Sequence, residues 1–489
     1  MTISSNSPIA PQTNYSASAM NPNQLIAELR TLLPAAAVLT ATEQQRPFEC
    51  DGLSSHTGLP LVTLLPTTVA EVQAVMRLCH RLGVPVVCRG AGTGLSGGAT
   101  PWAGGVLLVL SRLDQILSID APGLTAVVEP GVRNLAVSEA AAPWGLYYAP
   151  DPSSQIACSV GGNVAENAGG VHCLKYGLTV HNVLAVKLVT VSGELVEIGI
   201  DSDGPDLLAL VIGSEGLLGV VVEVTVRLLV LPPAVDTLLA AFDSVEAASQ
   251  AVSAVIGAGI IPAGLEMMDR LALTAAEDFA GAGYPRNAAA ILLVELDGPA
   301  SEVERDLEEC QALLLASGAS GVQVAADAEE RALFWKGRKN AFPAVGRLYP
   351  DYYCMDGTIP RRSIGDVLGF ISERSAHHDM PVANVFHAGD GNLHPLILFD
   401  ANCEGELEKA ELFGTEILEK CIAVGGTITG EHGVGREKID QMASQFTDAE
   451  LAQFRRIKAA FDPAGLLNPG KTIPTLKRCQ EYRALRHEH

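Results

Sequence analysis

Two glycine-dense segments in the first half of the chain restrict its fold more than any other feature. The first, RGAGTGLSGG at residues 89–98, follows a short apolar run that predicts a strand. The second is SVGGNVAENAGG at residues 159–170. Because glycine has no Cβ, such loops can gather backbone N–H groups around an anion or approach a flat ring closely. Two such loops in one region predict a binding site for a large, phosphate-bearing ligand.

The first loop also fits a more common motif, since Gly92, Gly94 and Gly97 satisfy the GxGxxG spacing of a Rossmann dinucleotide site. That site needs a helix that opens at the third glycine, so that its N-terminus faces the pyrophosphate. Here ATPWAGG at residues 99–105 follows instead and leads into another apolar run. We therefore exclude a Rossmann unit and expect a loop that wraps a diphosphate. A simple run of turns is the alternative that this loop alone leaves open.

Charge and cysteine usage exclude several classes of protein. The chain has 33 Lys and Arg against 56 Asp and Glu, a net charge of −23, which disfavours nucleic acid and anionic lipid as partners. Its ten cysteines form no CxxC pair, so no cysteine-ligated iron–sulfur cluster or zinc ribbon is indicated, and free thiols in a reducing cytosol are expected. Apolar runs are too short for a membrane span.

Changes in the pattern of apolar runs and turns along the 489 residues predict the domain boundaries. Residues 1–39 are expected to hold an extension without a signal peptide and a first helix. Residues 40–234 alternate short apolar runs with turns up to Pro232 and Pro233, and strand and helix patterns resume over 235–475. Residues 476–489 remain as a tail. We predict an α+β protein with two domains and a site between them.

Both glycine loops, together with GSEGLLG at residues 213–219, resemble the FAD-binding domain of the vanillyl-alcohol oxidase superfamily, in its branch acting on 2-hydroxy acids. The resemblance implies a two-part FAD-binding domain with a ferredoxin-like C-terminal cap. It also implies a non-covalent FAD, since the first loop contains no histidine. Leu217 stands where many relatives have threonine. The FAD contacts expected from these loops and from the C-terminal NPGK segment are Arg89, Gly90, Ala91, Gly92, Thr93, Gly94, Leu95, Ser96, Pro150, Asp151, Ser154, Ser159, Gly161, Gly162, Asn163, Asn167, Gly169, Gly170, Glu215, Gly216 and Asn468.

Histidines and an acid in the second half predict a metal site. His387 and His394 flank a Gly-Asp-Gly-Asn turn, and Glu431 precedes His432 in GEHGVG. Two imidazoles and one carboxylate are a common ligand set for Zn, Mn or Fe, although any lone histidine is more often structural. We predict that His387, His394 and Glu431 hold a divalent metal that polarises a substrate hydroxyl, and that His432 is the base. The same four positions match the metal ligands and base of the D-2-hydroxy-acid dehydrogenase branch.

A cationic segment, FWKGRKNAFPAVG at residues 334–346, supplies Lys336, Arg338 and Lys339. An anionic substrate needs a local cation in so acidic a chain, and a guanidinium suits bidentate carboxylate recognition. A solvated helix face is the alternative. In relatives the arginine of this WKxR element binds the substrate carboxylate, so Arg338 is the predicted anchor. Relatives that oxidise 2-hydroxyglutarate place a lysine where Cys354 aligns, so no second carboxylate is expected.

Residues 334–346, 351–362 and 461–471 narrow the resemblance to the FAD-linked subunits of bacterial glycolate oxidases. This implies oxidation of glycolate, or secondly of D-lactate, with hydride transfer to FAD. Electrons would then pass to a second flavin-domain subunit and an iron–sulfur subunit, and the cytoplasmic chain would reach the inner membrane only through these partners. The alternatives are a D-2-hydroxy-acid dehydrogenase that acts alone, a non-redox flavin transferase, and a non-catalytic flavin-binding scaffold.

Overall fold

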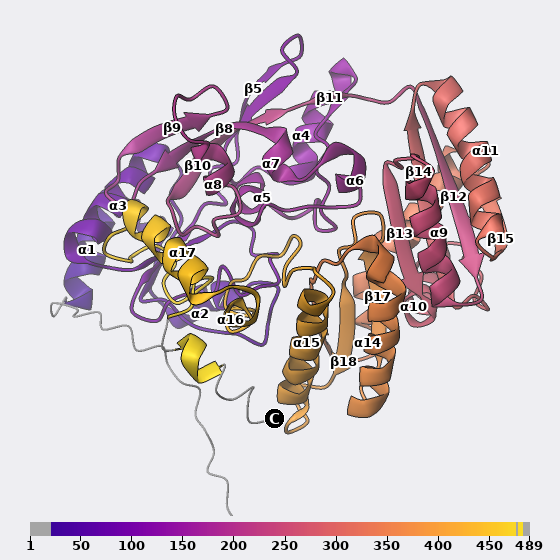
Figure 1. Ribbon diagram of the computed structural model, residues 1–489. Coiled ribbons are helices and arrows are strands. Elements are labelled where there is room, and N and C mark those ends of the chain that lie inside the picture. Colours follow the sequence, from indigo (N-terminus) through magenta and orange to yellow (C-terminus); the bar gives the residue numbers. More distant parts are fainter. Residues whose placement is uncertain (1–20, 476–477, 483–489) are drawn as a thin grey trace, which may run out of the picture.

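The first lobe of the protein, coloured indigo to magenta in Figure 1, contains two larger sheets and a two-stranded one. The computed structural model describes residues 21–475 and 478–482. In the first sheet, β2, β4 and β3 are parallel, and β1 pairs antiparallel with β2. These strands read as continuous apolar runs because the sheet is covered on both faces. The sheet has the order β1 (Val38–Leu39), β2 (Val62–Leu64), β4 (Val106–Val109), β3 (Val86–Arg89), with α1 (Pro22–Leu32), α2 (Thr42–Gln45) and α3 (Val69–Leu82) nearby in sequence.

The second sheet of this lobe is antiparallel and half-buried. Its longest strand, β10 (Val220–Arg227), alternates buried and partly exposed residues, as its VVVEVTVR sequence predicts. The order is β5 (Ile116–Asp120), β6 (Thr125–Val128), β10, β8 (Val183–Val189), β9 (Leu195–Gly199), and a two-stranded sheet pairs β7 (Leu146–Tyr147) with β11 (Leu229–Val230). The helices of this part are α4 (Asn134–Ala141), α5 (Val160–Glu166), α6 (Cys173–Tyr176), α7 (Thr179–Asn182) and α8 (Leu207–Val211).

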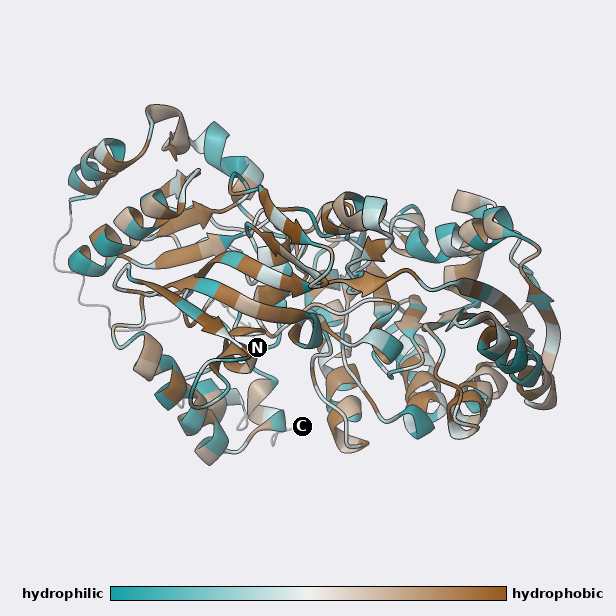
Figure 2. Ribbon diagram, turned by 90° about the horizontal axis from the view of Figure 1, so that it is seen from above, coloured by the Kyte–Doolittle hydropathy of each residue, from teal (hydrophilic) through white to brown (hydrophobic). Residues whose placement is uncertain are grey.

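The second lobe, the cap, is one antiparallel sheet with helices on both faces. Successive residues of β12 serve different cores: Leu238 and Ala240 join one apolar cluster and Leu239 joins another. Figure 2 shows the apolar strands in brown and the polar helix surfaces in teal. The strand order is β15 (Ala319–Val324), β12 (Ala234–Phe242), β14 (Ala290–Gly298), β13 (Gly264–Asp269), β17 (Val382–His387), β18 (Pro395–Phe399), β16 (Asp351–Cys354). One face packs on α9 (Val245–Gly257), α11 (Ala300–Ala316), α14 (Ile364–His378) and α15 (Glu406–Ala423), and the other on α10 (Arg270–Ala280), α12 (Ala328–Lys339) and α13 (Ala341–Val345).

After α15 the chain returns to the first lobe, where α17 (yellow) lies in Figure 1. Leu467 forms an isolated bridge with Val86, and the Lys458 ammonium donates to the Leu217 carbonyl at 2.6 Å. The returning segment contains α16 (Met442–Gln445) and α17 (Asp448–Phe461). The C-terminal residues therefore complete the first core, and the glycine loops lie beside a segment more than 300 positions away in sequence.

The predicted α+β class, with a two-part first lobe and an antiparallel cap, is confirmed. The predicted domain limits at 40, 234 and 475 stay predictions. Residues 1–20 of the expected extension, and 476–477 and 483–489 of the expected tail, lie outside the described residues. Within residues 21–475 and 478–482, the helices are all too short or too polar to cross a membrane.

Candidate active site

A cavity of about 500 Å³ lies between the two lobes. The first lobe contributes both glycine loops and the turn around Glu215, and the cap side contributes residues near the end of α12 together with His394, Glu431 and His432. One cavity therefore brings together the predicted ligand-binding loops and three of the four residues of the predicted metal and base cluster. The predicted FAD contacts that line it are Arg89, Gly90, Ala91, Gly92, Thr93, Gly94, Leu95, Ser154, Ser159, Gly161, Gly162, Asn163, Glu215 and Gly216.

Close packing against neighbouring side chains explains two glycines in the first wall. A Cβ on Gly90 would overlap the Ser159 hydroxyl, so the two glycine loops can meet only without a side chain there. Gly92 has a φ of 76°, in the left-handed region that favours glycine. The Arg89 guanidinium closes one end of this wall by donating to the Cys50 carbonyl at 2.6 Å.

The other predicted FAD contacts do not line the cavity, and several support the wall from behind. Asn468 donates from Nδ2 to the Gly98 carbonyl at 3.2 Å and to the Glu215 carbonyl at 2.7 Å. Asn167 caps the C-terminus of α5 with a φ of 54°, and its side chain accepts from the Val180 N–H. The residues outside the lining are Ser96, Pro150, Asp151, Asn167, Gly169, Gly170 and Asn468.

The predicted metal ligands converge on one carboxylate oxygen. β17 ends at His387, a tight turn with Gly391 at a φ of 83° follows, and β18 starts directly after His394, so both imidazoles lie on one side. Glu431 Oε1 is 3.2 Å from the Nε2 atom of His387 and 3.2 Å from that of His394. One ligand atom from each of the three residues lies within 4.8 Å of the other two. This donor set fits a borderline divalent metal.

His432 lies against this cluster with its ring stacked on that of His394, at a centroid distance of 4.9 Å and an angle of 10°. Burial lowers the pKa of His432 to about 4, because the charged imidazolium would lose its hydration. The ring is therefore neutral at neutral pH. A neutral imidazole at the cavity wall can accept a proton.

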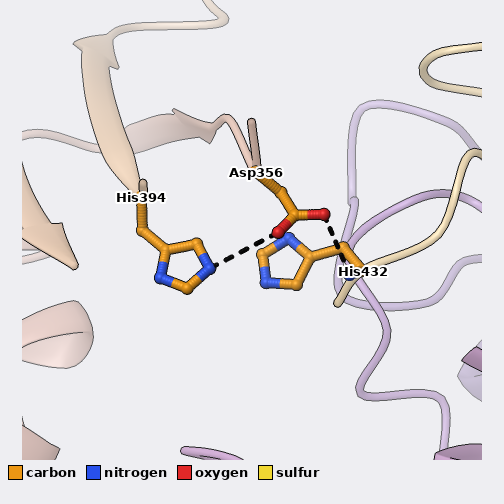
Figure 3. Close-up of side chains that lie close together, drawn as sticks. All are labelled: Asp356, His394 and His432. Atoms are coloured by element: carbon orange, nitrogen blue, oxygen red, sulfur yellow. Dashed lines mark hydrogen bonds and ion pairs between the residues drawn. The ribbon is translucent and has the colours of Figure 1, made fainter. Parts of the chain in front are cut away.

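Asp356 organises the loop that carries Glu431 and His432. Its carboxylate accepts from the His432 backbone N–H at 2.9 Å and from the buried Lys438 ammonium at 3.1 Å. Figure 3 shows it beside the rings of His394 and His432, with His394 Nε2 at 3.6 Å. Burial alone would raise the pKa of Asp356, but Lys438 and the neighbouring histidines hold it well below its usual value. These three residues form a second possible metal set that shares His394.

Arg338 takes a position that the sequence did not predict. Its side chain is 1% exposed, does not line the cavity, and donates from Nε to Glu266 Oε2 at 2.8 Å. Glu266 also accepts from His387 Nδ1 at 2.6 Å. The next residue, Lys339, does line the cavity. Sequence reasoning missed Glu266 because nothing distinguishes an isolated acid inside an apolar strand until the strands are paired.

Glu166 is a second residue that the sequence did not single out, although it lies within the second glycine loop. It ends α5 and lines the cavity near Glu215 and Asp51. Burial, followed by these two carboxylates, raises the pKa of Glu166 well above its ordinary range. The glycines of this loop predict a role for its backbone, whereas the sequence pattern gives no signal for its one acidic side chain.

A polar cluster joins the two lobes beside the cavity. His172 of the first lobe pairs through Nδ1 with Asp151 at 2.8 Å and through Nε2 with Glu295 of β14 at 3.0 Å. Trp335 donates to the second oxygen of Glu295. Burial opposes the charged form, but the two carboxylates raise the pKa of His172 to about 10. Asp151, which is predicted to contact FAD, thus takes part in this contact between the two lobes.

Comparisons with known proteins bear on the fold and the family of the chain. A model described as "FAD binding domain" matches residues 60–199, and one described as "FAD linked oxidases, C-terminal domain" matches residues 231–472. The glycolate oxidase subunit GlcD of Escherichia coli K12 is 60% identical over 464 residues, which is 94% of this chain and 93% of that protein. A D-lactate dehydrogenase of Anaerostipes hadrus is 32% identical, over 92% of this chain and 97% of that protein.

A solved structure of p-cresol methylhydroxylase with substrate bound has the same fold. It superimposes with a TM-score of 0.79 over 93% of this chain and 97% of its own, at 17% identity. At that identity the likeness concerns the fold alone. It confirms the architecture that the family resemblance implies.

Proposed function

The chain belongs to the family of FAD-linked oxidases, and from this premise we propose that it oxidises glycolate to glyoxylate and, secondly, D-lactate to pyruvate. The observation that carries the proposal is the shared cavity, in which both glycine loops face His394, Glu431 and His432. A cofactor on the loop wall and a hydroxy acid on the histidine wall would meet there.

The cofactor chemistry is simple to state. FAD, when bound by the two glycine loops, supplies the acceptor for the hydride that leaves C2 of the substrate. A divalent ion held by His387, His394 and Glu431 would supply a Lewis acid for the substrate hydroxyl. This ligand set is favoured over the set with Asp356, whose carboxylate already accepts from Lys438 and from several backbone N–H groups.

The residues of the chain itself would move the proton and orient the substrate. His432 is neutral and lies at the cavity wall, so its imidazole can receive the hydroxyl proton as the hydride leaves. Asp356 keeps the His432 backbone in place. The His172 cluster joins the two lobes through its contact with Glu295.

Two cations compete for the substrate carboxylate in this proposal. Arg338 keeps the role that the family pattern implies, but it would have to share or leave Glu266 to reach the cavity. Lys339 lines the cavity already. We therefore propose Arg338 as the buried anchor and Lys339 as the cation that the anion meets first.

We also infer that the chain works within a larger assembly, because the Escherichia coli relative is named a subunit. Among the described residues, neither group of possible metal ligands contains a cysteine, so no cysteine-ligated iron–sulfur cluster is indicated beside FAD. In this proposal a second flavin-domain subunit and an iron–sulfur subunit accept the electrons and bring the chain to the inner membrane. Turnover of the isolated protein should then require an artificial dye, and equally fast turnover with oxygen alone would contradict it.

A substrate panel tests the proposed reaction. The FAD-loaded protein is mixed anaerobically with glycolate, D-lactate or L-lactate, and the flavin absorbance is followed. We expect bleaching by glycolate, slower bleaching by D-lactate and none by L-lactate. Faster bleaching by D-lactate would favour a D-lactate dehydrogenase that acts alone, the second candidate, which the relative from Anaerostipes hadrus supports. No bleaching by any hydroxy acid would leave the scaffold alternative.

A further inference from the structure

A buried carboxylate lies directly behind the metal-binding histidines. Glu266 is the third residue of β13, and its side chain is 1% exposed. The antiparallel register of β13 with β17 places Glu266 opposite His387, although 121 positions separate them in sequence. A charge at such a position is costly unless it is paired. The strand therefore carries it for a purpose other than apolar packing.

The two oxygens of Glu266 have different partners. Oε1 accepts from Nδ1 of His387 at 2.6 Å, and Oε2 accepts from Nε of Arg338 at 2.8 Å. The other ring nitrogen of His387 faces Glu431 at 3.2 Å. One carboxylate thus connects the predicted metal ligand His387 to the predicted carboxylate anchor Arg338.

The geometry points to Glu266 as a positioning residue for the metal site, and we propose this role on the basis of the proposed function. By accepting from Nδ1–H, Glu266 fixes the tautomer of His387 in which Nε2 has a free lone pair directed at the ligand set. Its second oxygen holds Arg338 at the back of the same site. The metal and the substrate carboxylate would then be positioned by one shared acid.

A merely structural ion pair is the competing interpretation, and the chain offers a matched residue to separate the two. Glu295 lies on the neighbouring strand β14, opposite Gly264. It is also buried, and it also accepts from a histidine, His172, and from a second donor, Trp335. Glu295 does not contact the proposed metal ligands. The two acids are alike in their burial and in the kinds of donor they accept from. They differ in the histidine that they contact, which is His387 for Glu266 and His172 for Glu295.

The experiment compares Glu266→Gln with Glu295→Gln in the full-length, FAD-loaded protein. The affinity for Zn²⁺, and separately for Mn²⁺, is measured by competition with a chelator, and flavin content is recorded as a second readout. Loss of such an outer partner typically weakens metal binding by about 10- to 100-fold. We expect that loss in Glu266→Gln, wild-type metal affinity in Glu295→Gln, and unchanged flavin content in both.

Glu266→Gln leaves Arg338 buried without a counter-ion, which can itself prevent folding. The double variant Glu266→Gln/Arg338→Met removes both charges, so metal affinity can still be measured if the single variant does not fold. It should show the same loss of metal affinity. Wild-type affinity in the folded single or double variant would overturn the proposal, as would an equal loss in Glu295→Gln. Absence of Zn²⁺ and Mn²⁺ binding to the wild-type protein would instead refute the metal site, and this inference with it.

Discussion

The wall of the cavity that the first lobe supplies is dominated by the two glycine-rich loops, whereas the cap side supplies the histidines and Glu431. At Gly90 a Cβ would overlap the Ser159 hydroxyl, so glycine lets the two loops meet there, and Gly90 and Gly92 both line the cavity. On the other side, His394, Glu431 and His432 come from two separate loops and are held by Asp356. The glycine loops of the first wall can therefore bind and orient a ligand, while on the second wall the neutral imidazole of His432 can accept a proton. Changes to each wall should therefore have separate effects.

His432→Asn is expected to give the largest difference between the effect on FAD binding and the effect on flavin reduction. The variant keeps the loop wall, so FAD content should be unchanged, but it removes the proton acceptor and should slow flavin reduction by glycolate about 10²- to 10⁴-fold. Anaerobic stopped-flow absorbance measures this step. His378→Asn is the control, because His378 is also a buried histidine of the cap but pairs with Glu416 on α15. Near-normal reduction in His432→Asn would remove this residue from the mechanism.

The opposite effect is expected on the loop wall. Gly90→Val introduces a side chain where a Cβ already overlaps the Ser159 hydroxyl, and overpacking of this kind costs about 1–3 kcal/mol. FAD affinity, measured by fluorescence titration of the apoprotein, should fall, while affinity for Zn²⁺ should stay at the wild-type value. Gly104→Ala is the control, since no atom lies within 4 Å of a Cβ there. Parallel loss of both ligands would show that the walls are not independent.

The stability that the His172 cluster gives to the contact between the two lobes should depend on pH. The pKa of His172 is about 10 in the folded protein, against an ordinary value of 6.5. Because the folded value is the higher one, its stabilising effect is complete below about pH 6.5 and is lost as the pH rises toward 10. His172→Gln should therefore cost about 2 kcal/mol at pH 6 and much less at pH 10. Urea unfolding at the two pH values measures this, and a pH-independent difference would contradict the charged pair.

The smallest effect is expected at Lys339, an exposed residue of the cavity lining. Lys339→Met removes an exposed cation from the cavity lining, so it should raise KM for glycolate by the equivalent of about 0.5–1 kcal/mol and leave kcat unchanged. Lys336→Met is the control, because Lys336 is exposed on the same helix and does not line the cavity. The effect should also fade with added salt. Equal KM values in the two variants would assign no role to Lys339.

The same comparison explains what could be predicted from the sequence. The loop wall is encoded locally, because glycines at fixed spacing determine the backbone conformation within a few residues. The turn that brings His387 and His394 together is local as well. Glu266 and Asp356 could not be found in this way, since only the pairing of distant strands and loops places them at the site. Arg338 was recognised as an important cation, but its burial against Glu266 depends on the same pairing.

The most direct test of the account asks whether both walls are needed at once. The FAD-loaded protein is treated with a chelator, dialysed, checked by elemental analysis, and mixed anaerobically with glycolate before and after Zn²⁺ or Mn²⁺ is restored. The account predicts an unchanged flavin spectrum in the metal-free protein, no bleaching by glycolate, and recovery of bleaching with the metal. Rapid bleaching of a protein shown to contain no metal would contradict it.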